Sequence, residues 1–218
     1  MSQKTRTGDV VQSDAPGNFV YYWEMRIFAF QNQKGMWRDI FLTIIQLTTS
    51  PQQAWNHIEK DEETRDEFFN RFLHPLFAII AVTSFIGGIG LMHGAGLQMA
   101  LKMAIINIVT LYSSYYIVSY TLNEMAVQFG LEKNRYLYQR FVGYSSVVMY
   151  ALYMVMPLLS DFFILWVFAL YTIYIVYNGA EIFMKTREEK RMNFSIVATL
   201  LIVAVPGLIN AFMIYLIH

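Results

Sequence analysis

Long apolar runs separated by short polar segments dominate this chain of 218 residues. A helix that crosses a bilayer needs roughly 20 mainly apolar residues, because it rises about 1.5 Å per residue across about 30 Å of hydrocarbon. Five runs come close to this length: Leu73–Met92, Met99–Leu122, Phe141–Leu159, Phe162–Ala180 and Phe194–Ile217. The pattern therefore predicts an all-α membrane protein with five transmembrane helices in a bundle.

The boundary between the third and fourth runs is short, since only Ser160 and Asp161 interrupt the apolar sequence there. One helix over both runs would overshoot any bilayer. Pro157, near the end of the third run, favours a break in the helix. We therefore expect a tight helical hairpin at this point.

Ahead of the first run, an apolar stripe recurs at helical spacing, with Trp37, Ile40, Phe41, Ile44 and Ile45 as its members. Such a stripe predicts an amphipathic helix. Its apolar side either lies in the membrane surface or packs against the rest of the protein. The pattern itself favours neither of these two arrangements.

A second helix in this region should begin at Pro51. Ser50, Pro51 and Gln53 occupy the N-cap, N1 and N3 positions of a capping-box pattern. The polar segment Met1–Asn18 has no apolar core of a signal peptide. We expect a flexible tail over residues 1–35, cytoplasmic or interfacial amphipathic helices over residues 36–72, and the five-span transmembrane domain over residues 73–218.

Basic residues alternate between the segments that join the runs. They occur before the first run, between the second and third, and between the fourth and fifth, as Lys60, Arg65, Arg71, Lys133, Arg135, Arg140, Lys185, Arg187, Lys190 and Arg191. Because Lys and Arg concentrate in cytoplasmic loops, the N-terminus should be cytoplasmic and His218 outside. On the outer side, Lys102 and Asp161 should lie close together, since opposite charges reduce each other's cost in lipid.

Composition limits the chemistry that the chain can perform. Its formal net charge is zero, which predicts no nucleic-acid partner. It contains no Cys, so disulfides and thiolate sites are excluded. Its four His residues do not occur at metal-ligand spacing, and no nucleophile or phosphate-loop motif is present. We therefore predict a protein that is not an enzyme and has no cofactor and no metal site.

Polar side chains within the runs are the remaining candidates for a site, because they are costly in lipid and usually face the interior of a bundle. Glu124, Tyr144, Asn178 and Glu181 should reach the cytoplasmic side at similar depth and form a polar cluster. This cluster either binds a small ligand, a lipid headgroup or an ion, or it only joins helices and lines the interface. If the two carboxylates share a pocket, one should have a raised pKa or a basic partner such as Arg140.

Several features occur together that are typical of one family: Pro51, Trp55 and Ile58 ahead of the first span, Gly143-Tyr144-Ser145 opening the third, and a polar, basic loop between the fourth and fifth. With the five-span plan, they make the chain resemble the Yip family of Ypt/Rab-interacting type, in particular its bacterial members, from about Ile45 to the C-terminus. The Asp-Leu-Tyr…Gly-Pro element of eukaryotic members is absent. The resemblance thus implies a fold and a bacterial cytoplasmic membrane rather than Golgi or ER, and does not extend to Rab-GTPase binding.

Two function classes follow. The resemblance, together with the few charges inside the runs, favours a non-enzymatic scaffold or adaptor of membrane organisation or trafficking type. Such a protein would contact membrane lipids and engage protein partners at its cytoplasmic face, and assembly as a homo-oligomer stays open. The alternative is a small transporter or channel that uses the polar faces of spans two and four, which a deep water-accessible cavity would favour.

Overall fold

The structure is a computed structural model that describes residues 37–90, 96–158 and 163–217. Contacts between residues divide the chain into two compact units, Met1–Arg38 and Asp39–His218. In the second unit, every regular element among the described residues is a helix. This confirms the all-α class that the apolar runs predict.

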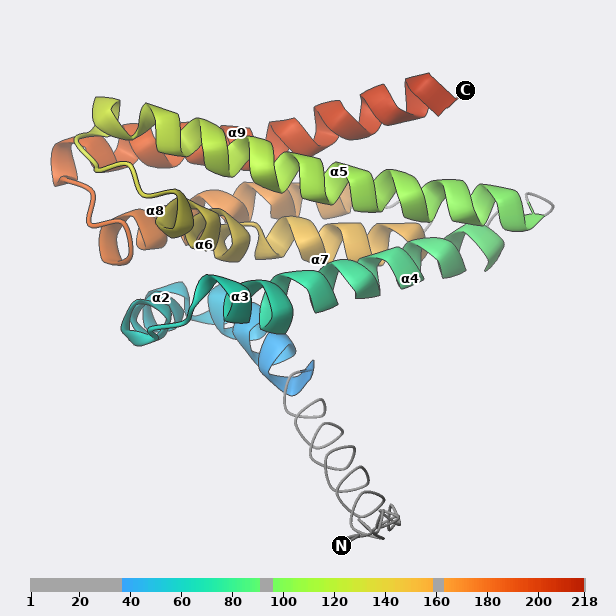
Figure 1. Cartoon of the computed structure of the whole chain (residues 1–218), viewed down its shortest axis with the longest axis horizontal. Coiled ribbons are helices and arrows are strands. Elements are labelled where there is room, and N and C mark those ends of the chain that lie inside the picture. Colours follow the sequence, from blue (N-terminus) through green and yellow to red (C-terminus); the bar gives the residue numbers. More distant parts are fainter. Residues whose placement is uncertain (1–36, 91–95, 159–162, 218) are drawn as a thin grey trace, which may run out of the picture. The chain divides into compact units, whose positions relative to one another are not determined.

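The helices follow one another with short connections (Figure 1). A helix over residues 39–49 of the second unit comes first, and we call it the 39–49 helix. The others are α2 (Pro51–Lys60), α3 (Arg65–Phe68), the π-helical η1 (Phe69–Leu73), α4 (His74–Gly90), α5 (Gly96–Met125), η2 (Ala126–Phe129), α6 (Arg135–Ser145), α7 (Val147–Val155), η3 (Met156–Leu158), η4 (Phe163–Tyr171), α8 (Thr172–Ile182) and α9 (Glu188–Ile217).

Three continuous helices among the described residues are long and apolar enough to cross a membrane: Arg65–Ile89, Gly96–Phe129 and Glu188–Leu216. A fourth candidate combines α6 and α7, which are bent by 47° at the break between them. The remaining apolar helix, Val167–Ile182, is shorter. The chain is therefore a multi-pass integral membrane protein with three or four candidate spans in its described parts, and the five-span plan stays a prediction.

The helix α5 is central to the bundle, because it packs against α4, α6 and α9. Figure 1 shows α5 beside α9, with α4 along the other side of α5. The buried face of α5 carries Leu111, Tyr115, Val118 and Leu122, which recur at the spacing of one helix face. Ile105 on the same helix is more than half exposed, at 54%, as expected of a side chain that faces lipid.

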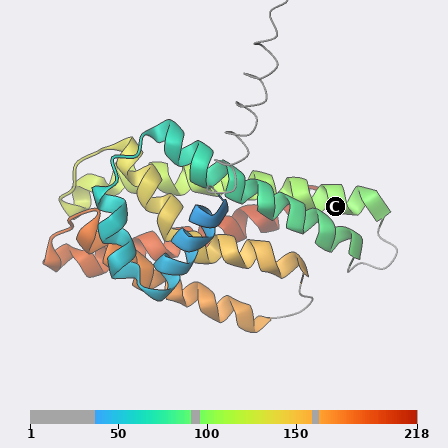
Figure 2. The ribbon, with the colours of Figure 1, turned by 90° about the horizontal axis from the view of Figure 1, so that it is seen from below.

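The helices α2 and α8 form the second part of the packing, since α2 lies against α8 and α8 against α9. Figure 2, seen from below, shows the 39–49 helix and α2 meeting at an angle on one face of the bundle. Lys185 pairs with Glu59 of α2 at 2.8 Å, and Lys190 donates to the Gln128 carbonyl at 2.8 Å. The connections over residues 130–134 and 183–187 thus lie at one end of the bundle, which we call the basic-loop end.

Helix starts in the N-terminal region follow the sequence pattern in part. The helix α2 begins at Pro51 as predicted, but the Ser50 side chain makes no capping hydrogen bond. A complete capping box stands instead at α3, where Thr64 and Glu67 each accept from the other's backbone N–H. This box satisfies two donors that a helix start leaves without partners.

The predicted contact of Lys102 with Asp161 cannot be compared, because Asp161 lies outside the described residues.

Candidate functional site

The indole of Trp55 anchors α2 to the bundle. Its side chain is completely buried, and Nε1 donates to the Ile175 carbonyl of α8 at 3.0 Å. The ring packs on Phe141 and Phe183, with centroid distances of 5.7 Å and 5.4 Å. A buried indole N–H needs a hydrogen-bond acceptor. An N–H that is buried without an acceptor costs more free energy than the hydrogen bond contributes. The acceptor on α8 therefore fixes both the depth and the orientation of Trp55.

Two glycines make room for aromatic rings from α2 and α3. A Cβ atom on Gly179 would lie 2.6 Å from Cε2 of Trp55, and one on Gly143 would lie 2.4 Å from Cζ of Phe68. Both distances are far below van der Waals contact. Gly143 belongs to the Gly-Tyr-Ser motif of α6, so this motif has a packing role at the junction with α3.

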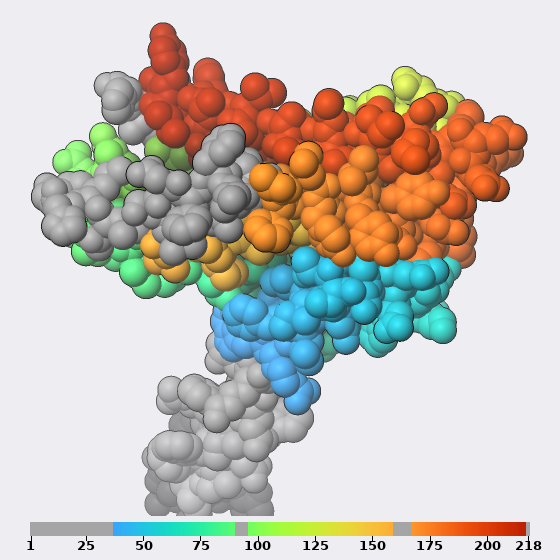
Figure 3. Space-filling view, turned by 180° about the vertical axis from the view of Figure 1, so that it is seen from behind, coloured from blue at the N-terminus to red at the C-terminus, as the bar shows by residue number. Residues whose placement is uncertain are grey.

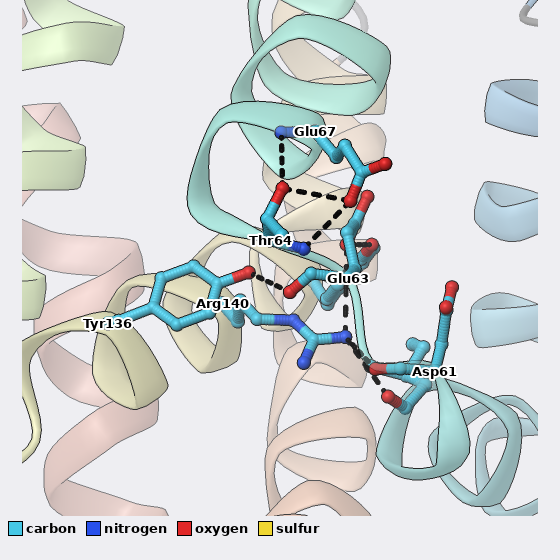
Figure 4. Close-up of polar contacts among 8 residues, drawn as sticks. Asp61, Glu63, Thr64, Glu67, Tyr136 and Arg140 are labelled. Atoms are coloured by element: carbon cyan, nitrogen blue, oxygen red, sulfur yellow. Dashed lines mark hydrogen bonds and ion pairs between the residues drawn. The ribbon is translucent and has the colours of Figure 1, made fainter.

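The guanidinium of Arg140 connects α6 to the end of α2 (Figure 4). Only 8% of the residue is exposed. Its Nη2 donates to the carbonyls of Ile58 and Asp61, both at 3.1 Å. The last carbonyls of a helix have no partner within it and carry a partial negative charge, so a cation placed there is stabilising. Arg140 thus caps the C-terminus of α2 from a neighbouring helix.

Glu63 completes this group of buried and half-buried polar side chains. Its Oε2 lies 3.8 Å from Nη2 of Arg140 and accepts a hydrogen bond from the Tyr144 hydroxyl at 2.9 Å. Its backbone carbonyl accepts from the Tyr136 hydroxyl at 2.6 Å. We call Glu63, Tyr136, Arg140 and Tyr144 the Arg140 cluster. It holds the segment between α2 and α3 against α6.

The electrostatics of Glu63 combine opposing effects. Burial raises the pKa of the carboxyl above its ordinary value of 4.5, while the hydrogen bond from Tyr144 and the charge of Arg140 act against this rise. The positive charge of Arg140 is also placed over two aromatic rings, 5.8 Å from the Tyr136 centroid and 5.4 Å from that of Phe183. Such cation–π contacts add to the stabilisation of a buried guanidinium.

The two carboxylates of the predicted polar cluster have separate basic partners. Glu124 pairs with Lys133, which follows it in the chain by nine residues. Glu181 pairs with Arg191 of α9 at 3.2 Å. Both carboxylate side chains are almost half exposed, at 44% and 47%. Arg140, named from the sequence as a possible partner, contacts Glu63 instead.

The other two predicted residues also lie apart. The Asn178 amide donates to the Tyr174 carbonyl of its own helix at 2.7 Å, whereas Tyr144 belongs to the Arg140 cluster. Among these four described side chains, no hydrogen bond or ion pair joins one to another. Their shared role at one end of the bundle therefore stays a prediction.

Sequence reasoning missed Glu63 as a site residue. It lies in a charged segment of the kind that is typical of solvated surface, and its hydrogen-bond partner Tyr144 is 81 positions away in the chain. No local spacing pairs residues so far apart. The Thr64-x-x-Glu67 pattern was a usable signal, because a capping box there predicts a helix start and places Glu63 directly before the N-cap residue Thr64.

In the described parts of the chain, no group of three or more His, Asp or Glu side chains is arranged to hold a metal ion. The Arg140 cluster contains a cation, a carboxyl and two phenols, and each of them makes at least one hydrogen bond with backbone or within the cluster, while Nε of Arg140 is buried without a partner. Its geometry suits the joining of two chain segments.

Comparison with protein families adds to this picture. The model of the Yip1 domain matches residues 45–209. The chain belongs to the Yip1 family. The Yip1 domain includes Trp55, its acceptor Ile175 and the whole Arg140 cluster, so the junction between α2 and the bundle lies inside the family's domain. Comparisons with curated proteins and with solved structures found no match.

We predict that Gly179→Ala destabilises the Yip1 domain by about 1–3 kcal/mol, because the new methyl group would overlap the Trp55 ring. Thermal unfolding in detergent measures this effect. Gly207→Ala is the matched control, since a Cβ on Gly207 of α9 meets nothing within 4 Å. Equal melting temperatures for the two variants would contradict the close approach of Trp55 to α8.

The raised pKa of Glu63 predicts a pH-dependent stability. Because the folded chain keeps this proton at pH values where the unfolded chain has released it, the unfolded state binds fewer protons in that range. The stability that protonated Glu63 contributes is fully present below pH 4.5, and it is lost as pH rises through the raised pKa of the folded state. Melting curves from about pH 4 to about pH 7 should show this decline in the parent protein and a smaller one in Glu63→Gln. Glu62→Gln, at an exposed neighbour, should keep the parent profile.

Proposed function

We propose that this protein is a non-enzymatic membrane scaffold or adaptor, of membrane organisation or trafficking type, in a bacterial cytoplasmic membrane. Its N-terminal helices are docked on the Yip1 bundle and form a platform for protein partners. The observation that carries this proposal is the double attachment of α2, through Trp55 to α8 and through Arg140 to α6.

The attachment supports a platform because it orders a segment that would otherwise lose conformational entropy on binding a partner. A surface that is already ordered needs no such loss at the moment of contact. Contacts with two different helices hold α2: the Trp55 side chain donates to a carbonyl of α8, and the Arg140 side chain of α6 donates to carbonyls at the end of α2. An enzyme would instead need a nucleophile with a base, or a metal, in a cleft.

Exposed charges at the basic-loop end suit the recognition of a partner. The pairs Glu124–Lys133, Glu181–Arg191 and Lys185–Glu59 all lie there and are in part exposed. Such surface pairs stabilise a fold little, so their charges are available for contacts with another protein. Within this proposal, Glu124, Tyr144, Asn178 and Glu181 keep their place at the functional end, with the two carboxylates as outward contacts and Tyr144 as a buried support.

The alternative of a small transporter or channel stays a prediction. Ser114 of α5, Tyr150 of α7 and Pro206 of α9 line a cavity of about 10 Å³. That volume offers space for about one water molecule. The described residues that line this cavity belong to α5, to residues 142–153 and to α9, so the cavity gives no support to a path along the polar face of α8.

Replacement of Trp55 tests the platform. Trp55→Phe keeps an aromatic ring and removes the donor to Ile175, so α2 should become more accessible to protease while the spans stay intact. Proteins that co-purify with the parent chain in mild detergent should be lost from Trp55→Phe and retained by Asn56→Ala, an exposed neighbour on α2. An unchanged set of partners in Trp55→Phe, with α2 shown to be released, would overturn the proposal.

The proposed orientation places the N-terminus and the basic-loop end in the cytoplasm and His218 outside, with η4 and α8 as the fourth of five spans. Reporter fusions after Arg135 and Arg187 should be active only in the cytoplasm, and a fusion after His218 only outside, because basic loops are retained on the cytoplasmic side. A fusion after Arg187 that reports from outside would exclude the five-span plan.

A further inference from the structure

The 39–49 helix divides its apolar side chains between two sides. Ile40 and Leu47 are buried, with 2% and 0% of their surface exposed. Phe41, Leu42 and Ile45 are exposed by 45%, 44% and 53%. Residues three and four apart lie on the same helix face, so these three form one outward apolar surface, which we call the Phe41 face.

The Phe41 face cannot turn inward without loss of existing contacts. The Tyr171 hydroxyl donates to the Thr48 carbonyl at 2.8 Å, which ties the end of this helix to the end of η4. The Ser50 N–H donates to the Gln46 carbonyl, and α2 then follows at Pro51 with its own anchor at Trp55. Rotation of the helix would also expose Leu47. The outward direction of the Phe41 face is therefore fixed by the fold.

The surface next to this helix is also apolar and exposed. Around Tyr171, the side chains of Phe168, Leu170, Ile173 and Tyr174 are exposed by 60%, 72%, 41% and 49%. Figure 3 shows the atoms of the N-terminal helices, in blue, directly beside those of η4 and α8, in orange. Large apolar side chains that point outward from an apolar helix of a membrane protein are suited to contact with lipid. The Phe41 face thus continues a surface of lipid-compatible chemistry.

We propose that the 39–49 helix lies in the membrane interface, with the Phe41 face inserted at the boundary between lipid headgroups and acyl chains. Interfacial helices bury such a face by about 5–10 Å and keep polar side chains toward water. Asp39, Thr43 and Gln46 recur at spacings of four and three residues along one edge of the helix, exposed or half-buried, and supply this polar side. The occupant of the face is a lipid surface, because the adjoining surface of η4 and α8 requires the same solvent.

Depth measurements on single-cysteine variants test this inference. The chain contains no Cys, so one introduced thiol gives one labelled position. Ile45→Cys reports the Phe41 face, and Gln46→Cys is the matched control one residue further along the same helix. Leu200→Cys on the candidate span of α9, 64% exposed, is the lipid reference, and Glu132→Cys in an exposed connection is the water reference. The full-length protein is labelled with one fluorophore and reconstituted in phospholipid vesicles.

Spin-labelled lipids should quench the label at Ile45→Cys several-fold more than that at Gln46→Cys, at a level approaching Leu200→Cys. Aqueous iodide should quench the two labels in the opposite order. Leu42→Cys repeats the measurement on the Phe41 face, so an effect of one substitution on folding does not decide the result. Circular dichroism and gel filtration must match the parent protein for each variant.

Three outcomes would overturn the inference. Quenching of Ile45→Cys by iodide at the level of Glu132→Cys would place the Phe41 face in water, where a soluble partner could cover it. Equal lipid quenching of Ile45→Cys and Gln46→Cys would contradict the orientation of the helix. Protection from both quenchers that disappears as the protein is diluted in lipid would show that a second copy of the chain covers the face.

Discussion

The Arg140 guanidinium is buried between α6 and the end of α2, and a buried positive charge must be compensated by fixed acceptors. The compensation comes from the carbonyls of Ile58 and Asp61 and from the nearby carboxyl of Glu63. All three belong to the end of α2 and the segment that follows it. The position of one buried cation on α6 therefore determines where the N-terminal helices end and where the first candidate span begins.

The relative strengths of these contacts explain why the junction is specific. Removal of one partner from a buried ion pair costs about 3–5 kcal/mol, because it leaves an uncompensated charge. Arg140 relies mainly on the two carbonyls at 3.1 Å, while Glu63 stays at 3.8 Å and is bound more closely by the Tyr144 hydroxyl. A carboxyl in this position loses hydration without a full ion pair in return, which is why burial dominates its pKa. The burial of the Glu63 carboxyl thus costs free energy, which the contacts with Arg140 and Tyr144 offset in part.

The parts of this structure that follow from the sequence are those that depend on a single local constraint. The thickness of a bilayer sets the length of an apolar helix, so the runs that became α4, α5 and α9 were recognisable. Proline needs no N–H partner at the first helical position, so the start of α2 at Pro51 was predictable as well. Glu124 and its partner Lys133 are close in the chain, but the sequence alone offered several basic residues for each carboxylate. The contacts of Arg140 span 79 and 82 positions, and such pairs are decided by packing that no short pattern records.

The motif Gly143-Tyr144-Ser145 illustrates the difference between a recognisable signature and its physical role. Every residue from Tyr138 to Tyr150 is buried, so the motif lies in the interior of the bundle. The Phe68 ring packs against Gly143, and the Tyr144 hydroxyl donates a hydrogen bond to the Glu63 carboxylate. The motif therefore acts between the N-terminal segment and α6, where an external partner has no access. The proposed surfaces for lipids and protein partners, which are the outer face of the 39–49 helix and the exposed charges of the basic-loop end, lie outside this buried junction and depend on it for their positions.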